Sequence, residues 1–400
     1  MTTPPSEARM ETTNSLFGGT MMSPIVDPFP VYRRLRDAHP ALPVNTMMGV
    51  NYMITRYADV EAVLKDGKLY SSKANQRGIG LVMGRTILEM EGKEHVRFRN
   101  LISPFFSPRA MKAEMPQTIG DILNGLIDDF AATGQADLVR QVTFTFPMQV
   151  MAHIIGIPVQ DYRAFHQMAL DLISVGDDPG KGFQAAQDLV TYLSPLMAQR
   201  KADPTDDLLS KLMHAEVDGV GLTDEEVLGF LRLLLPAGAE TTYRLTGSCL
   251  FALLTHPEVY EEVRADRGAI DALIQETLRW ESPVQFVSRE PTEDVVIGGD
   301  AVPAGGLLSV IVGSANRDER HYQDPDRFML HRKNDDHLAF GFGAHFCAGS
   351  HLALLETRTA LNLLLDRLPN LRLERDPDCH IVGLAFRSPN RLPVRFEPRH

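Results

Sequence analysis

The sequence predicts a mainly α-helical protein built as one large domain. Helical patterns dominate residues 110–211, and a long helix is expected from Thr223 to Thr255. Strand-like runs are few and short. No low-complexity tract, repeat or linker divides the 400 residues. We therefore expect a flexible tail over residues 1–23 and a single domain over residues 24–400.

The remaining elements follow from local patterns. Residues 71–89 contain three glycines and little periodicity, which is typical of a functional or mobile loop. Thr223 and Glu226 form a capping box at the start of the long helix, and Pro257 follows its end. The predicted short helices cover residues 29–39, 59–65, 94–100 and 269–280, with a further helix ending at residue 367; the predicted strands cover residues 52–55, 295–297 and 307–312, with strand-like pieces and a turn at 388–390 near the C-terminus.

Composition limits the classes of partner and site. The formal charge of −12 argues against nucleic acid or an anionic membrane as the main partner. Three cysteines without a CxxC pair do not support a disulfide framework, a zinc site or a four-cysteine iron–sulfur cluster. The N-terminal residues lack the apolar run of a signal peptide or a membrane anchor. We expect a soluble, cytoplasmic, monomeric protein with a small apolar ligand.

The segment from Phe340 to Gly349, FGFGAHFCAG, places Cys347 in a glycine-lined turn before an apolar helix. Backbone N–H groups at a helix N-terminus favour a thiolate, which is a permanent anionic ligand for a metal. Gly343 and Gly349 leave room for a flat, bulky group, such as a haem, to approach the backbone. For a lone cysteine, the alternative is an inert buried side chain. The spacing FxxGxxxCxG favours the ligand.

The centre of the long helix contains Pro236-Ala-Gly-Ala-Glu-Thr-Thr242. Pro236 removes a backbone donor, so the helix is expected to open there. Thr241 can return its hydroxyl to the Ala237 carbonyl or point it into the gap. Glu240 and Thr241 together are suited to relaying protons into a dry pocket. The alternative is a kinked core helix in which Glu240 pairs with an arginine such as Arg244.

Two more constellations support a buried ligand loop. Glu276 and Arg279 share a helix face, and Arg327 lies in a turn-rich segment farther along the chain. A buried Glu276 that bridges both arginines would brace the loop, whereas most such pairs are exposed and contribute little.

Four donors form the second constellation: His95, Arg99, Arg289 and His345. His95 and Arg99 lie one turn apart, and all four suit the two propionate carboxylates of a haem. Each taken alone is as consistent with an ordinary surface residue.

The substrate wall is the least determined part. Leu233 and Ala237 on the long helix, together with Val284 and Phe286, are candidates for it, although simple core packing is the favoured explanation for each.

Five motifs together resemble those of a soluble bacterial cytochrome P450. In order along the chain they are His95-x-x-x-Arg99, Ala237-Gly-Ala-Glu-Thr-Thr242, Glu276-Thr-Leu-Arg279, Asp324-Pro-Asp-Arg-Phe328 and the Cys347 loop. The resemblance covers residues 24–398. It implies a triangular helical prism with a smaller β-rich lobe, and haem b with Cys347 as axial ligand of the iron. A proximal thiolate pushes electron density onto the iron and favours O–O cleavage.

The resemblance implies roles for the other residues as well. Glu240 and Thr241 match the acid–alcohol pair that delivers protons, with Glu240 in place of the more frequent Asp. His95, Arg99, Arg289 and His345 match the positions that hold the propionates. The implied reaction inserts one atom of O2 into a C–H bond or across a double bond of a small to medium hydrophobic substrate.

Nothing in the sequence selects a terpenoid, steroid, fatty acid or aromatic substrate. Without a glycine-rich nucleotide loop, the electrons are expected from a separate ferredoxin and its reductase. Arg97, Arg109 and Lys112 are candidates for the docking patch on the Cys347 side. Two alternatives remain: a peroxygenase driven by hydrogen peroxide, and a haem-thiolate sensor that binds ligands without catalysis.

Overall fold

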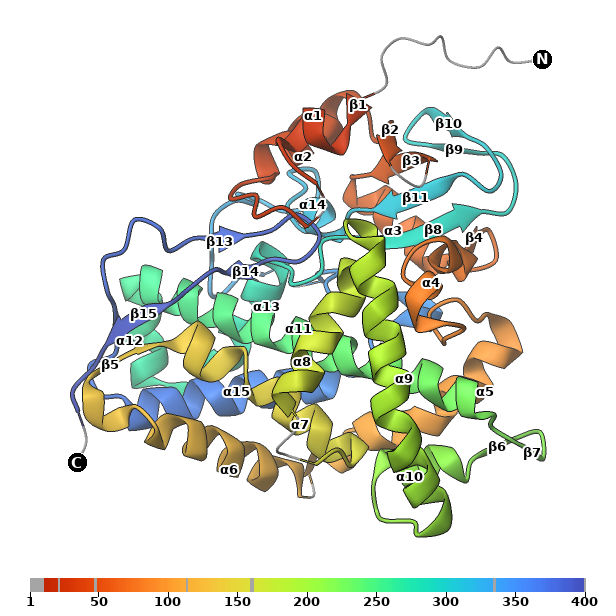
Figure 1. Cartoon of the computed structure of the whole chain (residues 1–400). Coiled ribbons are helices and arrows are strands. Elements are labelled where there is room, and N and C mark those ends of the chain that lie inside the picture. Colours follow the sequence, from red (N-terminus) through yellow and green to blue (C-terminus); the bar gives the residue numbers. More distant parts are fainter. Residues whose placement is uncertain are drawn as a thin grey trace.

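The computed structural model describes residues 11–20, 22–46, 49–112, 114–158, 162–333 and 336–398. A large helical body makes up most of this part of the chain, and a smaller strand-rich region packs on one side of it (Figure 1). The mainly α prediction is therefore confirmed.

The α-helices are α1 Thr13–Phe17, α2 Phe29–Ala38, α3 Tyr57–Lys65, α4 Gly80–Met83, α5 Gly92–Ile102, α6 Met115–Asp128, α7 Phe146–Ile155, α8 Tyr162–Ile173, α9 Pro179–Ala202, α10 Leu208–Met213, α11 Asp224–Thr255, α12 Pro257–Ala265, α13 Ile270–Trp280, α14 Val312–Ala315 and α15 Ser350–Arg367.

The strands are β1 Glu11–Thr12, β2 Ala41–Thr46, β3 Gly49–Ile54, β4 Tyr70–Ser71, β5 Gln135–Asp137, β6 Glu216–Val217, β7 Val220–Gly221, β8 Val287–Pro291, β9 Val295–Ile297, β10 Asp300–Val302, β11 Leu307–Val310, β12 Arg372–Leu373, β13 Ile381–Val382, β14 Ser388–Pro389 and β15 Pro393–Arg395. The largest sheet has the strand order β1-β2-β3-β11-β8-β4. In this sheet β11 runs parallel to β3 and antiparallel to β8, which carries Arg289.

The long helix α11 crosses the middle of the helical body, with α8 and α9 in front of it and α15 below it (Figure 1). Thr223 caps its first turn in the predicted capping box with Glu226, and Pro257 begins the next helix. The helix stays continuous through Pro236, so the expected opening does not interrupt it. It packs on α7, α8, α13 and α15, and 22 of its 32 residues are buried. Its apolar sequence therefore forms the axis of the main core, as predicted.

The expected tail needs a correction. Residues 1–10 lie outside the described part of the chain, but β1 pairs with β2, and α1 follows directly. Phe17 at the end of α1 is buried and meets Tyr32 edge to face, with ring centroids 5.6 Å apart. Burial of a phenylalanine contributes about 1.5–3 kcal/mol, which is enough to dock a short segment. Leu16 packs against the same cluster. The mostly polar composition of this segment gave no sign of these apolar contacts.

Two local predictions also change. Ser388 and Pro389 form β14, which pairs with β13, where the sequence suggested a turn. Residues 71–89 contain a 3₁₀ helix at Ser72–Arg77 and the short α4 rather than loop alone. None of the described helices has an apolar stretch long enough to cross a membrane.

Candidate active site

The turn before α15 holds Cys347 in a fixed backbone frame. The Cys347 N–H donates to the Phe340 carbonyl at 2.9 Å, which closes the loop. Gly343 has a φ of +72°, and a Cβ there would lie 2.9 Å from the Leu64 carbonyl oxygen of α3. A larger residue at position 343 would therefore strain the backbone and collide with α3. At Gly349 a Cβ would meet nothing within 4 Å, so this position alone keeps the open space that the sequence suggested for both.

Two observations describe the surroundings of the Cys347 side chain. The residue is exposed, yet burial raises the pKa of its thiol. Both observations hold together at a side chain that faces an internal opening. Hydrogen bonds from the backbone of Gly349 and Ser350 and the nearby Arg99 charge act in the opposite direction and lower this pKa. The predicted helix-terminus effect is therefore present, but burial has the larger effect on this pKa.

Four cationic or imidazole groups gather beside this loop. His95 and Arg99 project from α5, and the rings of His95 and His345 lie 4.2 Å apart. Arg99 donates to the carbonyl oxygens of Ala344 at 3.4 Å and Phe346 at 2.5 Å, which ties α5 to the loop. Arg289 of β8 lies close enough to His345 to lower the pKa of that ring. The structure therefore brings together residues from three distant parts of the sequence.

This cluster lacks sufficient negative charge. Burial, followed by the charges of Arg289, His95 and Arg99, lowers the pKa of His345 to about 3. Burial also lowers the pKa of Arg289 to about 10, and Glu91 compensates for only part of this effect. Within the described chain, Nε2 of the buried His95 has no hydrogen-bond partner. A ligand with two carboxylates would satisfy these donors, so the cluster fits the propionates of a haem.

The centre of α11 also contains accessible positions. Ala237 is exposed and Thr241 half-buried, although the residues around them on this central helix are buried. They lie one turn apart and therefore face the same opening. Gly238 keeps the helix close to α7, because a Cβ there would overlap the Met151 side chain. The Thr241 hydroxyl donates to the Ala237 carbonyl at 2.7 Å, one of its two predicted positions.

Glu240 is fully engaged on the other side of α11. Its Oε1 lies 2.9 Å from Nε2 of His166, and its Oε2 accepts from Arg244 at 3.2 Å. Its side chain is only 1% exposed. The Arg244 contact is the alternative that the sequence left open. His166 was missed, because it lies on α8, 74 residues away, and no local pattern connects it with α11.

The predicted brace exists with a different second arginine. Arg279 donates to both oxygens of Glu276, each at 2.8 Å, and all of these groups are buried. Arg332 provides the second guanidinium, with Nε 3.1 and 3.2 Å from the two Glu276 oxygens. Arg327 is exposed and contributes its backbone carbonyl, which accepts from Arg279 and from Arg332. The prediction that the Arg327 side chain is the second partner of Glu276 is therefore wrong, and Arg332 is that partner.

The packing of the candidate substrate residues decides the role of only some of them. Leu233 of α11 is buried in the main core. Val284 is half-buried and forms an isolated bridge with Phe386. Phe286 packs against the N-terminal core cluster that includes Phe17, which favours a packing role for that residue.

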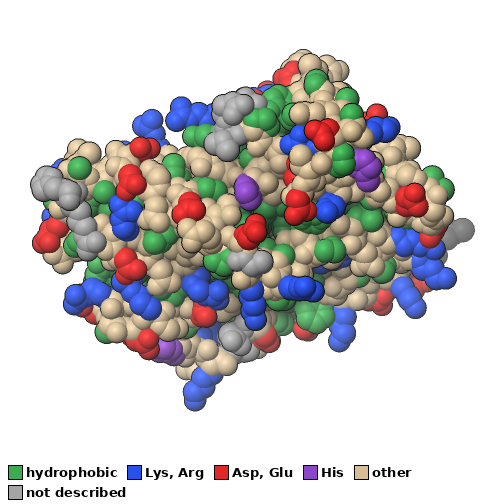
Figure 2. All heavy atoms as spheres, turned by 90° about the horizontal axis from the view of Figure 1, so that it is seen from below, with side chains coloured by type: hydrophobic (Ala, Val, Ile, Leu, Met, Phe, Trp, Pro, Cys, Tyr) green, Lys and Arg blue, Asp and Glu red, His purple; other side chains and the backbone are tan. Residues whose placement is uncertain are grey.

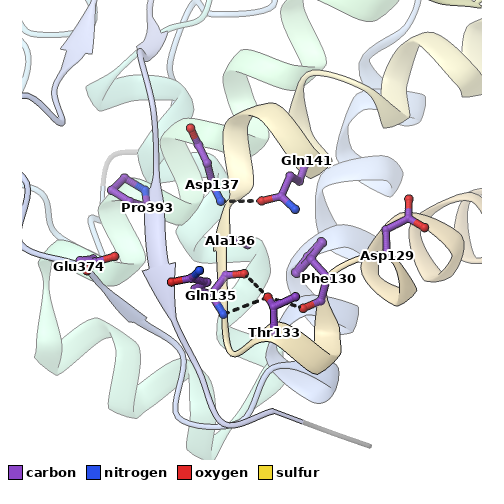
Figure 3. A pocket seen from close by; sticks show the side chains of 9 residues that line it. All are labelled: Asp129, Phe130, Thr133, Gln135, Ala136, Asp137, Gln141, Glu374 and Pro393. Atoms are coloured by element: carbon purple, nitrogen blue, oxygen red, sulfur yellow. Dashed lines mark hydrogen bonds between the residues drawn. The ribbon is translucent and has the colours of Figure 1, made fainter.

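A separate surface pocket of about 400 Å³ contains none of the predicted site residues. It lies between the end of α6, β5 and β15 (Figure 3). Its Asp137 accepts from the backbone N–H groups of Val139 and Leu392, so this carboxylate fastens the C-terminal strand to the helical body. The polar contacts in this pocket therefore have a structural role, and its lining side chains do not form a recognisable catalytic group.

The predicted docking residues differ in availability. Arg109 and Lys112 are exposed and lie near α15, which follows the Cys347 loop. Arg97 instead pairs with Asp218 of the β6–β7 hairpin. On the face drawn in Figure 2, basic and acidic side chains are interspersed. That face of this acidic protein therefore has no large continuous basic surface.

Comparison with known proteins supports one family. The family model described as cytochrome P450 matches residues 159–378. The monooxygenase PikC of Streptomyces venezuelae is 35% identical over 92% of this chain and 91% of its own length. The cyclomarin C epoxidase CymV of Salinispora arenicola is 34% identical over 92% of this chain and 96% of its own length.

Solved structures agree with these sequence matches. The myxobacterial cytochrome P450 CYP267B1, solved in complex with myristic acid, superposes with a TM-score of 0.88 and is 30% identical. The match covers 97% of this chain and 100% of that one. The described helical body and its smaller strand-rich region thus have the arrangement of a known fold.

Proposed function

Since this chain belongs to the cytochrome P450 family and is a haem-dependent monooxygenase, we propose that it inserts one atom of O2 into a small to medium hydrophobic substrate, by hydroxylation or epoxidation. The observation that carries the proposal is the accessible Cys347 beside a cluster of four donors, two of them buried and two half-buried, that lacks counter-charge. This arrangement suits an iron ligand next to two propionates.

The haem, when bound, supplies the activation of dioxygen that no side chain can provide. We assign Cys347 as the residue that would bind the haem iron. The Phe340 carbonyl and the Gly349 and Ser350 N–H groups hold it in position. We assign His95, Arg99, Arg289 and His345 as propionate donors. Ala237 leaves room beside the haem, because a larger side chain at this accessible helix position would enter the shared space.

Glu240 and Thr241 would move the protons that the reduction of oxygen requires. Thr241 is half-buried beside the accessible Ala237, and its hydroxyl, which donates to the Ala237 carbonyl in this structure, would turn toward a group bound there. Glu240 is the adjacent acid, and its contacts with His166 and Arg244 hold it away from that face in this structure. Proton delivery therefore needs a change in the position of the Glu240 side chain.

The substrate class rests on relatives and on the character of the cavity wall. The relative CymV is named as an epoxidase, and CYP267B1 was solved with a fatty acid. Ala237 and the neighbouring apolar core of α11 favour a hydrophobic guest in this chain as well. We propose that Val284 and Leu233 contribute to the wall.

Electrons would come from a separate ferredoxin-type protein with its reductase. Lys112 lies in a 3₁₀ helix, Ala110–Lys112, that packs on α15, and Arg109 directly precedes it. Both side chains are exposed and suit an acidic partner. Their charges would act mainly on the association rate, which depends on salt.

The test is turnover with isotopically labelled O2. Myristic acid and testosterone are titrated first, and the low-spin to high-spin spectral shift identifies a binder. The binder is then incubated with NAD(P)H, a ferredoxin and its reductase, and in parallel with hydrogen peroxide alone. Product that carries label from O2 supports the proposal. Faster product formation from peroxide alone would favour the peroxygenase alternative, and binding without product under either condition would favour a sensor.

A further inference from the structure

We propose that the N-terminal segment of this chain is a tether that holds the turn between α8 and α9 in place and thereby slows the entry of guests. We call residues 17–20 and 22–26 the N-terminal tether. The inference rests on the proposed function, because it assumes a site for a hydrophobic guest next to α11. It adds a contact between two parts of the chain that are distant in sequence.

The contact is made by one carboxylate oxygen of the α8–α9 turn. Asp177 Oδ2 accepts from the Thr20 hydroxyl at 2.5 Å and from the Met22 N–H at 3.3 Å. The next residue, Asp178, is the N-cap of α9, and its side chain accepts from the Lys181 N–H at 3.0 Å. The start of α9 therefore does not need the Asp177 carboxylate, whose hydrogen bonds within the described chain come from the tether.

The tether is fixed to the domain on both sides of this contact. Before it, Phe17 is buried and meets Tyr32 edge to face. After it, the buried Arg387 donates to the carbonyl oxygens of Ile25 at 3.0 Å and Val26 at 2.9 Å. A segment that is anchored at both ends loses little further conformational entropy when its middle makes a contact. Two hydrogen bonds can therefore restrain the α8–α9 turn, although the residues that make them are exposed.

Local contacts within the tether direct the Thr20 hydroxyl. The Thr20 N–H donates to the Ser23 hydroxyl at 2.8 Å, and the Ser23 N–H donates to the Thr20 carbonyl at 3.2 Å. A Cβ at Gly19 would lie 2.6 Å from the Ser23 Cβ, so a larger residue there would force these groups apart. The donor is thus preorganised for Asp177, which lowers the entropy cost of the contact.

The restraint reaches α9 because the turn packs tightly on that helix. Val175 of the turn is buried, and a Cβ at Gly182 of α9 would lie 2.8 Å from the Val175 Cβ. The missing side chain lets the turn and the helix fit together, so a restraint on the turn also restrains α9. Both α8 and α9 pack on α11, which carries the accessible Ala237, and they lie in front of it in Figure 1. Separation of this helix pair from the domain would expose α11, and the tether opposes that separation.

The experiment measures hydrogen exchange and ligand-binding kinetics in the haem-loaded protein. Thr20→Val removes the hydroxyl donor, Asp177→Ala removes the acceptor, and Thr20→Ser keeps the hydroxyl. The matched control is Asp171→Ala, which breaks the 2.7 Å ion pair between Asp171 of α8 and Lys181 of α9. That pair lies within the same two helices and does not involve the tether. Double variants combine Thr20→Val with each of the two aspartate changes.

Hydrogen exchange is followed in the peptide that covers residues 170–182. We expect Thr20→Val to speed this exchange by about threefold to tenfold, the factor that the loss of one hydrogen bond produces. The double variant with Asp177→Ala should exchange no faster than Asp177→Ala alone, because both changes remove the same contact. Thr20→Ser should resemble the parent protein. Asp171→Ala should also speed exchange, but its factor and that of Thr20→Val should multiply in the double variant.

Entry to the site is followed with 4-phenylimidazole, a nitrogen ligand of haem iron that carries an apolar ring. Its spectral change is recorded by stopped flow. In Thr20→Val, association and dissociation should both become faster by the factor seen in hydrogen exchange, and the equilibrium constant should stay the same. This pattern is expected because the tether limits opening in both directions, whereas a change in the site itself would alter the equilibrium constant.

Two results would overturn the inference. Unchanged exchange in Thr20→Val, or effects of Thr20→Val and Asp177→Ala that multiply, would show that this contact does not hold the turn. Faster exchange with unchanged association and dissociation rates would show that the tether does not limit entry. The absence of any 4-phenylimidazole spectral change in the parent protein would instead refute the proposed haem site, and hydrogen exchange would still support or refute the tether.

Discussion

Replacing Glu276 with glutamine should destabilise the folded protein by about 3 kcal/mol or more, because removal of one member of a buried ion pair leaves uncompensated charge. Glu276 accepts two bonds from Arg279 at 2.8 Å, one from the Met329 N–H at 2.8 Å, and two contacts from Arg332. Glutamine keeps one acceptor and turns an N–H₂ group toward two guanidinium groups. Both arginines would remain buried without a counter-ion.

The assay is urea unfolding followed by the fluorescence of Trp280, the single tryptophan of the chain. Its indole N–H donates to the Asp326 carbonyl at 2.9 Å in the same region, so it reports on this part of the fold. Arg332→Ala should also cost about 3 kcal/mol, since it removes a buried partner. Arg327→Ala is the control. Its side chain is exposed, so the expected change stays within about 0.5 kcal/mol.

The pattern across the three variants decides the outcome. A cost for Arg327→Ala equal to that of Glu276→Gln would refute the assignment of Arg332 and restore the side chain that the sequence suggested. A cost below about 1 kcal/mol for Glu276→Gln would refute the idea that this pair supports the fold, because exposed pairs contribute that little.

Three further predictions concern pH, cofactor binding and electron transfer. Burial raises the pKa of Glu356 well above 4.5, and no described residue forms a hydrogen bond with either of its oxygens. The stabilisation from its protonated form is complete below the unfolded pKa and is lost as the pH rises. The stability advantage of Glu356→Gln in urea unfolding should therefore grow from pH 5 to pH 8. A difference in unfolding free energy that stays constant with pH would contradict the predicted pH dependence. Arg289→Ala should weaken haem retention in competition with apomyoglobin by about tenfold, since a charge-assisted bond is lost, and unchanged haem loss would remove Arg289 from the propionate site. Exchanging Arg109 and Lys112 for glutamate should slow reduction by a ferredoxin and leave the substrate-induced spectral shift unchanged; an unaltered reduction rate at low salt would exclude this docking surface.

The sequence identified residues whose role is set by local spacing. Cys347, Gly343 and Phe340 lie in one short turn, and the capping box of α11 is formed by neighbours in the chain, so each was predicted from a pattern. The Glu276–Arg279 pair was likewise visible, because residues three apart share a helix face.

Roles that depend on tertiary contact were not predictable in this way. Arg327 and Arg332 lie five residues apart in an irregular segment, and spacing does not determine which guanidinium turns inward. The partner of Glu240 came from α8, where a single histidine among helical residues carries no distinguishing pattern. The N-terminal segment packs through Phe17, and its polar neighbours suggested a free tail.

The claim that Cys347 binds the haem iron is tested most directly by the spectrum of the reduced carbon monoxide complex. A thiolate ligand shifts the main haem absorption band to long wavelength. We predict this band for the parent protein and for the Cys249→Ala and Cys379→Ala variants, since both of those cysteines are buried and lie outside the site. Cys347→His should keep the haem and lose the band. The account is contradicted if Cys347→His retains the band, or if either of the other variants loses it while remaining folded.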